Sequence, residues 1–490
     1  MASLEEIRSD RLKKLEALKE AGKNPYPIKS TKTHTLASVA EFFDALESAE
    51  EKVILVGRVM ARRGQGALIF FDLFDGTGKF QAVAKKDVLG EEELSLFDET
   101  VDVGDFVEVS GTLFTTKQGE KTLQADSWVM LSKSLRPLPD KWHGLQDVEE
   151  RFRKRYLDSL MDDAVRTRFL IRSQIIAEVR QFLNKAGFIE METSMLQSLA
   201  GGATATPFET HHEALDIDLH LRLAPELDLK KMVIGGFPMV YEIGRCFRNE
   251  GIDTTHNPEF TMLEAYESFA DADKGRDRIE NLFKQIVKNI FTEEVVRFDN
   301  NEIDFSKPFA VIKYLDLIKE YTGLEDVWEM SEVDLTTYAQ KENIKIDPTY
   351  DKAKIIDHIY KKLCRSNIIQ PTFLVDYPAP FSPLAKKKED DPALIDRFQL
   401  VIGGMEMVNA FSELNDPIEQ RARFMEQEKN KERGDAEAQP KDEDYLEAME
   451  YGLPPAFGFG IGIDRLVMLL TDTKSIKEVI YFPTLRPKGE

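Results

Sequence analysis

Five short apolar runs, separated by turn residues, follow a charged segment at the start of the chain. The runs are Val53–Val56, Leu68–Phe71, Phe80–Ala84, Phe106–Val109 and Trp128–Leu131, with turn residues at 75–78, 104–105 and 118–119. Short strands at this spacing are typical of an OB-fold barrel, which commonly binds oligonucleotides. We therefore predict an OB-fold over residues 51–135. Another small barrel or a sandwich without a ligand would give the same pattern.

The segments on either side of this barrel have patterns of their own. Ile7, Leu12, Leu15 and Leu18 are spaced as on one face of a helix, so residues 1–50 are expected to form a helical extension. This extension also carries a group of basic side chains, Arg8, Arg11, Lys13, Lys14, Lys19 and Lys23. The helix could contact RNA or simply pack on the next domain, and the two interpretations are compatible. Pro137 and Pro139 mark a linker at residues 136–150.

Residues 151–490 mix helical and strand patterns. Apolar residues at 175, 176, 179, 182 and 183 predict a helix that ends at Gly187, and residues 188–192 predict a strand. Apolar runs at 239–243 and 260–263 enclose a polar loop, as in a long antiparallel hairpin. Residues from about 310 to 365 combine helical spacing with charge and are expected to form a helical insertion. These patterns predict an α+β protein.

The composition narrows the class of protein. A net charge of −23 argues against a general nucleic-acid binder, so any positive surface for RNA must be local. No apolar run approaches the roughly 20 residues of a membrane span, and the charged N-terminal segment does not have the pattern of a secretory signal. Cys246 and Cys364 cannot build a disulfide framework and do not have metal-site spacing. A protein of the reducing cytoplasm, without a membrane partner, is expected.

The loop of the hairpin concentrates candidate chemistry. Arg248, Glu250 and His256 lie near its tip, and Phe260 follows. Arginine binds phosphate oxygens in a fixed fork, a carboxylate can accept from an adenine amine, and an aromatic ring can stack on the base. This set favours a nucleoside triphosphate site over a surface hairpin with scattered charges.

Two further segments carry candidate site residues. Gly458, Gly460 and Gly462 allow a ligand to approach the backbone, and Arg465 follows near the start of a predicted helix, where anions are favoured. In residues 405–412, strict strand alternation places Asn409 and Glu413 on one face and Glu406 on the other. Either the strand bends or bulges near Gly403-Gly404, or the two acids do different work.

The hairpin segment RNEG…HNPEFTMLEAY resembles the second signature motif of class II aminoacyl-tRNA synthetases, and its wording is most similar to the lysyl-tRNA synthetases. The segment GFGFGIGIDR resembles the third motif, and the helix–strand pair before residue 192 resembles the first, which forms the dimer interface. RPLPDKWHGL and RYLD, at the junction after the barrel, are also typical of this family. The resemblance implies an OB-fold anticodon-binding domain followed by a catalytic domain, at 151–490, built on an antiparallel sheet flanked by helices.

The resemblance also implies roles for individual residues. The expected ATP-binding residues are Arg248, Asn249, Glu250, His256, Asn257, Phe260, Glu406, Met407, Gly462, Ile463, Asp464 and Arg465, with Arg248, His256 and Arg465 catalytic. The expected lysine-binding residues are Gly202, Glu226, Arg248, Glu264, Tyr266, Asn409 and Glu413. Arg62, Phe70 and Gln81 are expected near the anticodon, and Glu406 is expected to bind Mg²⁺. The acid-rich lining suits a substrate with two ammonium groups, whereas aspartate or asparagine would need a cationic or amide-reading group.

Three positions depart from the family pattern. Ser194 replaces a usual proline at the expected dimer interface, and Thr206 replaces a frequent arginine. Gln399 replaces a common glutamate that binds a second magnesium position. An amide oxygen can bind Mg²⁺ but adds no charge, which predicts an altered number or affinity of metal ions.

The expected activity is ATP-dependent ligation of L-lysine to tRNA(Lys) through a lysyl-adenylate, with release of AMP and pyrophosphate by a homodimer. Two alternatives remain open from the sequence. One is a related ligase, for aspartate, asparagine or the lysylation of a protein. The other is a non-catalytic RNA-binding or regulatory relative.

Overall fold

The computed structural model describes residues 3–64, 66–139, 145–199, 201–203, 205–432 and 440–488. The chain divides into two compact units, Met1–Gln146 and Asp147–Glu490. Each unit has its own hydrophobic core. Residues 140–144 of the predicted linker lie outside the described residues.

The first unit is a closed five-stranded barrel with strand order β1-β2-β3-β5-β4. Its strands are β1 (Val53–Arg63), β2 (Leu68–Phe74), β3 (Lys79–Lys85), β4 (Phe106–Thr115) and β5 (Lys121–Ser132). Its helices are α1 (Leu4–Glu20), α2 (Leu36–Glu41), α3 (Phe43–Ser48), α4 (Lys86–Leu89) and α5 (Glu91–Thr100). The barrel closes through the antiparallel β1–β4 pair and the parallel β3–β5 pair, which confirms the predicted OB-fold.

Strand alternation explains how the barrel buries its core. In β2, Ile69, Phe71 and Leu73 are fully buried, whereas Phe70 points outward and is partly exposed. The ring of Phe71 lies 4.9 Å from that of Phe97 on α5, which belongs to the same core. The sequence left open which of the two adjacent phenylalanines faces the core, and the structure assigns that place to Phe71.

Helix α1 packs on the barrel through both apolar and basic side chains. Leu15 and Leu18 are buried, and Ser3 caps the helix in a capping box with Glu6. The guanidinium of Arg11 is buried and donates to the backbone oxygen of Val103 at 2.9 Å. Three further basic side chains of the segment also form ion pairs, Lys14 with Asp102, Lys19 with Glu16 and Lys23 with Glu93. The contacts of Arg11, Lys14 and Lys23 support the packing interpretation of this segment, whereas the Lys19–Glu16 pair lies within α1.

The second unit is built on an eight-stranded sheet with the order β14-β15-β16-β17-β18-β11-β10-β6. Its strands are β6 (Ile189–Glu190), β10 (Met239–Phe247), β11 (Glu259–Ser268), β14 (Ala310–Lys313), β15 (Thr372–Pro378), β16 (Leu394–Ile402), β17 (Met405–Ser412) and β18 (Ala456–Gly462). All neighbouring pairs are antiparallel except β14–β15 and β10–β6. Strand β6 has two residues and is shorter than the strand predicted at 188–192.

Two small sheets accompany the main one. They consist of β7 (Leu196–Gln197), β8 (Phe208–His212) and β9 (Ile217–Leu221), and of β12 (Val295–Phe298) and β13 (Asn301–Asp304).

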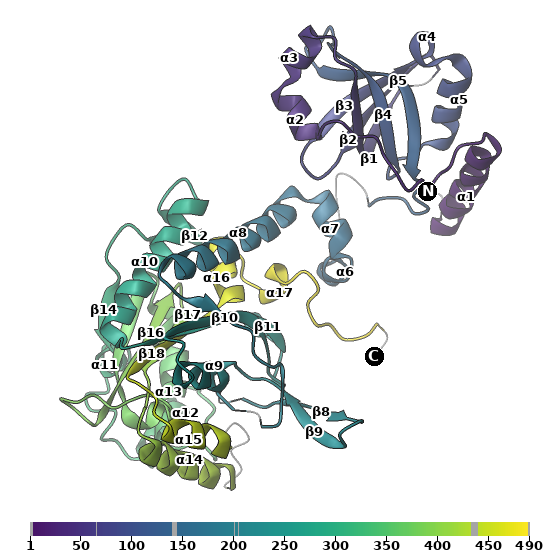
Figure 1. Cartoon of the computed structure of the whole chain (residues 1–490). Coiled ribbons are helices and arrows are strands. Elements are labelled where there is room, and N and C mark those ends of the chain that lie inside the picture. Colours follow the sequence, from purple (N-terminus) through teal and green to yellow (C-terminus); the bar gives the residue numbers. More distant parts are fainter. Residues whose placement is uncertain are drawn as a thin grey trace. The chain divides into compact units, whose positions relative to one another are not determined.

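Helices cover both faces of the main sheet (Figure 1). One face packs on α8 (Asp163–Lys185), α10 (Ala272–Ile290), α16 (Ile463–Leu470) and α17 (Ile476–Val479). The other packs on α9 (Glu226–Ile234), α11 (Tyr314–Thr322), α12 (Glu332–Lys341), α13 (Lys352–Leu363), α14 (Pro417–Glu432) and α15 (Glu443–Glu450). Two short helices, α6 (Val148–Arg153) and α7 (Arg155–Met161), precede α8, and short 3₁₀ turns occur at Arg365–Asn367 and Ala379–Phe381. The predicted α+β architecture, with helices flanking a mainly antiparallel sheet, is therefore confirmed.

Alternation along β11 decides which side chains reach each face of the sheet. Leu263 and Ala265 point into the core shared with α8, α10 and α16. Tyr266 belongs to the core on the α9 side. Glu264 lies two residues before Tyr266 on the strand and therefore points to the same side. Glu264 therefore lies on the α9 face, whereas Glu267 pairs with Arg278 of α10 on the other face.

The segment from 310 to 365 begins with the edge strand β14 and continues as α11, α12 and α13. These helices contribute Leu317, Leu335 and Ile356 to the core on the α9 face. In the described part of the chain, no helix combines the length and apolar character needed to cross a membrane.

Candidate active site

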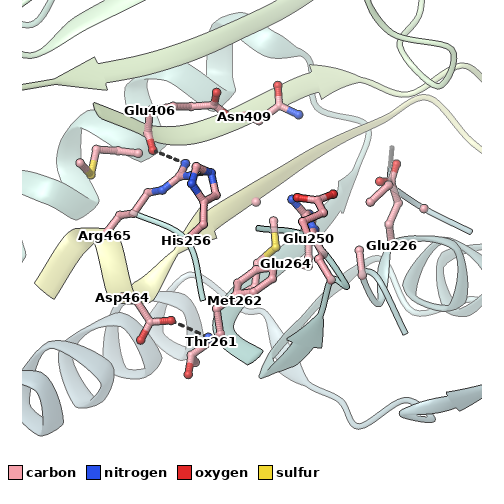
Figure 2. Close-up of a pocket in the computed structure, with 18 of the residues that line it drawn as sticks. Glu226, Glu250, His256, Thr261, Met262, Glu264, Glu406, Asn409, Asp464 and Arg465 are labelled. Carbon is pink, nitrogen blue, oxygen red and sulfur yellow. Dashed lines mark hydrogen bonds between the residues drawn. The ribbon is translucent and has the colours of Figure 1, made fainter. Parts of the chain in front are cut away.

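A cavity of about 300 Å³ opens on the α9 face of the large sheet (Figure 2). It is lined by residues of the β10–β11 loop, β11, β17, β18, α9 and the first turn of α16. The sequence-predicted residues that line it are Gly202, Glu226, Arg248, Glu250, His256, Asn257, Phe260, Glu264, Glu406, Met407, Asn409, Gly462, Asp464 and Arg465. Segments more than 200 residues apart in the sequence thus converge on one site, as for His256 and Arg465.

The β10–β11 hairpin positions Arg248 where it can bind an anion. The two strands pair from Met239↔Glu267 to Phe247↔Glu259, and the backbone N–H of Arg248 donates to the oxygen of Pro258 at 2.8 Å. The guanidinium of Arg248 lies 5.0 Å over the ring of Phe260, and its Nε is buried without a hydrogen-bond partner among the described residues. A buried donor without a partner is costly, so this nitrogen suits a ligand oxygen.

His256 is oriented from both sides. Its Nδ1 lies 2.9 Å from the carboxylate of Asp253, and its Nε2 lies 3.1 Å from a guanidinium nitrogen of Arg465. Because a guanidinium can only donate, Nε2 accepts here, and Nδ1 carries the proton that is donated to Asp253. Figure 2 shows His256 and Arg465 side by side, with Arg465 also donating to the backbone oxygen of Glu406 at 3.3 Å.

Asp464 anchors the start of α16. One carboxylate oxygen accepts from the backbone N–H of Thr261 at 2.7 Å (Figure 2). The other accepts from Arg172 on α8 at 2.6 Å. Asp464 is 2% exposed, so its ion pair with Arg172 is largely shielded from water. Its carboxylate is therefore engaged in holding α16 against β11 and α8, next to Arg465.

A β-bulge brings Glu406 to the cavity. The β16–β17 register runs from Arg397↔Phe411 to Leu400↔Val408 and then shifts to Val401↔Glu406, which leaves Met407 as an extra residue. Glu406 and Asn409 consequently line the same cavity although they are three residues apart. The bulge that the sequence allowed near Gly403-Gly404 is therefore present. Asn409 also accepts from Nε of Arg397 at 3.0 Å.

Three glutamates gather at the α9 end of the site. Glu226 and Glu264 line the cavity, and Glu413 lies behind them, 1% exposed. The hydroxyl of Tyr266 donates to Glu264 at 3.1 Å. Burial raises the pKa of both Glu264 and Glu413, and the charge of Glu226 raises both further. The site thus gathers carboxyl groups whose ionised forms a cationic ligand would stabilise.

The glycines of β18 make room for these acids. A Cβ on Gly458 would lie 2.2 Å from Oε1 of Glu413, and one on Gly460 would lie 2.6 Å from Oε1 of Glu264. Gly460 and Gly462 line the cavity, as expected for ligand approach, whereas Gly458 does not. Gly458 is needed because protein side chains cross the strand there.

Lys230 is a site residue that the sequence analysis missed. Its Nζ lies 2.6 Å from Glu226 and 2.5 Å from Glu413, and the residue is 1% exposed. Burial alone would lower the pKa of Lys230, but the charges of Glu226 and Glu413 outweigh it and raise the pKa. The signal available in the sequence was its i,i+4 spacing from Glu226 on a predicted helix.

Five predicted residues do not line the cavity. Tyr266 and Glu413 lie directly behind its wall, Ile463 is buried in the core, and Asn249 is exposed. Gln399 is buried, and its Oε1 accepts from the hydroxyl of Tyr377 at 2.9 Å. This placement argues against Gln399 as a metal ligand.

The predicted metal site contains one carboxylate, that of Glu406. Within the described residues, no group of three or more His, Cys, Asp or Glu side chains is arranged to hold a metal ion. Magnesium in nucleotide sites is commonly bound by one or two carboxylates together with substrate phosphates. The donor set therefore fits a magnesium ion that arrives with a polyphosphate and does not fit an all-protein metal cage.

The predicted anticodon residues lie on the barrel of the first unit. Phe70 is partly exposed, and the guanidinium of Arg63 lies 5.7 Å from its ring. Gln81 accepts from Oγ1 of Thr122 at 2.9 Å. Arg62 forms an ion pair with Asp98 and donates to the backbone oxygen of Val101 at 2.5 Å. Of these predicted residues, Phe70 alone presents a partly exposed ring for stacking.

Comparison with known proteins identifies the family. The family described as tRNA synthetases class II (D, K and N) matches residues 147–486, and the OB-fold nucleic acid binding domain matches residues 53–131. A protein named lysine–tRNA ligase from Dehalococcoides mccartyi is 45% identical over 99% of this chain and 98% of its own length. Proteins of the same name from Enterococcus faecalis and Moorella thermoacetica are each 45% identical over 99% of both chains. The chain therefore belongs to the class II lysyl-tRNA synthetase family.

Proposed function

We propose that the protein ligates L-lysine to tRNA(Lys) in two steps, through a lysyl-adenylate. The observation that carries this proposal is the gathering of Glu226, Glu264 and Glu413 at one end of a cavity whose other end presents arginine and histidine donors. One end suits an amino acid with two ammonium groups, and the other suits a triphosphate. The name shared by the full-length relatives supports the same activity.

In the first step, the carboxylate of lysine attacks the α-phosphorus of ATP and pyrophosphate leaves. Arg248 binds the α-phosphate and the attacking carboxylate. Its buried Nε has no hydrogen-bond partner among the described residues, so binding a ligand oxygen there breaks no existing bond of that atom. His256 and Arg465, 3.1 Å apart, hold the γ-phosphate, and Nε2 of His256 must gain a proton to donate to it. Catalysis is then positioning and charge stabilisation, without a covalent enzyme intermediate.

The remaining residues of this end hold the nucleotide. Glu250, Asn257 and Phe260 place the adenine, and Met407 and Gly462 complete the surroundings of ATP. Asn249 and Ile463, which do not line the cavity, adjoin Arg248 and Gly462 in the chain. Asp464 acts through Arg465 because both of its oxygens are engaged with the protein. Magnesium, when bound with ATP, neutralises the polyphosphate, and Glu406 is the carboxylate that would hold it.

At the acidic end, Glu226 and Glu264 bind the α-ammonium of lysine, with the backbone of Gly202 nearby. Glu413 and Tyr266 bind the ε-ammonium, and Asn409 lies between the nucleotide and the amino acid. In the second step, the terminal adenosine of tRNA(Lys) attacks the carbonyl of the adenylate and AMP leaves. Phe70, Gln81 and Arg62 contact the anticodon, and Arg62 must exchange its contact with Asp98 to do so.

The assembly proposed is a homodimer in the cytoplasm. Leu170 on α8 and Ile189 on β6 are 56% and 46% exposed, in the helix–strand pair that resembles the dimer motif. Ser194 lies just beyond this pair and bears on the shape of such an interface. Cys246 and Cys364 are buried and free, which suits a reducing compartment.

ATP–pyrophosphate exchange measured with each of the twenty standard amino acids tests the proposal. Lysine should support the highest rate, and purified tRNA(Lys) should then accept labelled lysine. Stronger exchange with aspartate or asparagine would assign the chain to another branch of the same family. Exchange with lysine but transfer to a protein, without charging of tRNA, would favour a protein-modifying ligase. No exchange with any amino acid in a folded protein would favour a non-catalytic relative.

A further inference from the structure

Lys230 places a protein ammonium inside a site proposed to bind a substrate ammonium. It projects from α9 between Glu226, one turn earlier on the same helix, and Glu413 at the end of β17. Its Nζ also lies 5.4 Å from the ring of Phe411 and 5.7 Å from that of Tyr266. The side chain is thus enclosed by acids and aromatic faces, where only a fully paired cation is stable.

The two oxygens of Glu413 have different surroundings. Both are buried and accept no hydrogen bond of good geometry among the described residues, but Oε2 forms an ion pair with Nζ of Lys230 at 2.5 Å. Oε1 lies over the backbone of Gly458, where a Cβ would approach it to 2.2 Å. A buried carboxylate oxygen without a donor is costly, so Oε1 is the atom that a ligand cation would complete.

The spacing along β18 matches the length of lysine. Glu264 lies over Gly460, which lines the cavity, and Glu413 lies over Gly458, two residues farther along the strand. Two residues of a strand span about 6.6 Å. The six bonds from the α-nitrogen to Nζ of lysine, each about 1.5 Å long, span at most about 7.5 Å, so a slightly bent side chain covers this distance. An α-ammonium at Glu264 therefore places the ε-ammonium at Oε1 of Glu413.

We propose that Lys230 is a specificity-determining residue, because it occupies one oxygen of Glu413 and leaves a single acceptor for the substrate side chain. This inference rests on the proposed activation of lysine. An ammonium is a compact point charge and can form an ion pair with one carboxylate oxygen. A guanidinium binds a carboxylate best through two parallel hydrogen bonds, which need both oxygens. Lys230 therefore selects lysine against amino acids that carry a guanidinium.

The test compares substrates of equal length in two variants. S-(2-aminoethyl)cysteine carries an ammonium, and 2-amino-4-guanidinobutanoate carries guanidinium nitrogens at the same number of bonds from Cα as Nζ of lysine. Lys230→Met removes the ammonium and keeps a side chain of similar length. Lys231→Met is the matched control, because Lys231 lies on the same helix but is partly exposed and pairs loosely with Asp228 at 3.8 Å. kcat/KM is measured for each substrate by ATP–pyrophosphate exchange.

In Lys230→Met, the preference for the ammonium over the guanidinium substrate should fall at least tenfold relative to the wild type. The KM for ATP should stay within twofold, and Lys231→Met should keep the wild-type preference. An unchanged preference in Lys230→Met, or a loss of activity in equal proportion for both substrates, would overturn the proposal. Either result would mean that Lys230 only supports the fold.

The wild-type protein provides a measurement that does not depend on the folding of the variant. As inhibitors of lysine-dependent exchange, the aminoethylcysteine should bind at least tenfold more tightly than the guanidinium analogue. Equal inhibition by the two analogues contradicts the single-acceptor site even if Lys230→Met does not fold. Absence of lysine-dependent exchange in the wild type would instead refute the proposed function, so the two failures are distinguishable.

Discussion

The KM for lysine should depend steeply on pH, because the acids proposed to bind it are buried close to one another. Burial raises the pKa of Glu264 from 4.5 to about 8, and the nearby charge of Glu226 adds to the effect. Burial raises the pKa of Glu413 in the same direction, although Lys230 opposes it. Below this range, the empty pocket holds a proton where a substrate ammonium would bind. Binding therefore requires the loss of that proton.

The size of the effect follows from the ionised fraction. With a pKa of about 8, a carboxyl is ionised to roughly 1% at pH 6, 9% at pH 7 and 50% at pH 8. The apparent dissociation constant is the intrinsic constant divided by the competent fraction. The KM for lysine should therefore fall about ninefold from pH 6 to 7, about fivefold from pH 7 to 8, and less than twofold from pH 8 to 9.

The free energy of unfolding should fall over the same pH range in which lysine binding improves. A carboxyl whose pKa is raised by folding binds more protons in the folded state, so its contribution to stability is lost as the pH rises from about 5 to 8. Saturating lysine should reduce this loss because the ammonium stabilises the ionised form. A thermal-shift series with and without lysine measures both trends.

The KM for lysine is measured by ATP–pyrophosphate exchange at saturating ATP and constant ionic strength. Glu264→Gln should raise the KM and flatten its dependence on pH. Glu267→Gln is the matched control, because Glu267 lies on the same strand but pairs with Arg278 at 2.8 Å, away from the cavity. A wild-type KM that changes less than twofold between pH 6 and pH 8 would refute the reasoning.

Three further predictions concern other parts of the site. Arg248→Ala should lower exchange by about 10²–10³, because it removes a preorganised donor from the reacting phosphate. Replacing Phe70 and Gln81 together by alanine should lower the kcat/KM for tRNA(Lys) in aminoacylation and leave tRNA-independent exchange unchanged. Gln399→Glu should leave the magnesium concentration for half-maximal exchange unchanged, because the structure turns this side chain to Tyr377.

Each of these predictions has a contrary outcome. A folded Arg248→Ala protein with near-native exchange would give Arg248 another role. Parallel loss of exchange and aminoacylation after the Phe70 and Gln81 changes would contradict the separation of anticodon binding from activation. A lower magnesium requirement in Gln399→Glu would show that residue 399 can contribute to magnesium binding.

The sequence by itself determined the elements whose signals are local. Alternating apolar residues predicted the barrel strands, and two strand patterns around a polar loop predicted the hairpin that carries Arg248 and His256. Strand geometry also required Phe70 and Phe71 to point in opposite directions. These features depend on neighbours within a few residues, so a linear pattern contains them. The resemblance to the family motifs then indicated which side chains should lie together in the active site.

The tertiary structure decided what depends on partners distant in the chain. The extra residue at Met407, visible only in the pairing with β16, brings Glu406 to the cavity. The turn of Gln399 toward Tyr377 depends on the neighbouring strand β15. The pairing of Lys230 with Glu413 joins residues 183 positions apart, and Gly458 is required because Glu413 crosses its backbone. Register, burial and charge pairing of this kind arise from packing, and the local pattern of a single segment does not encode them.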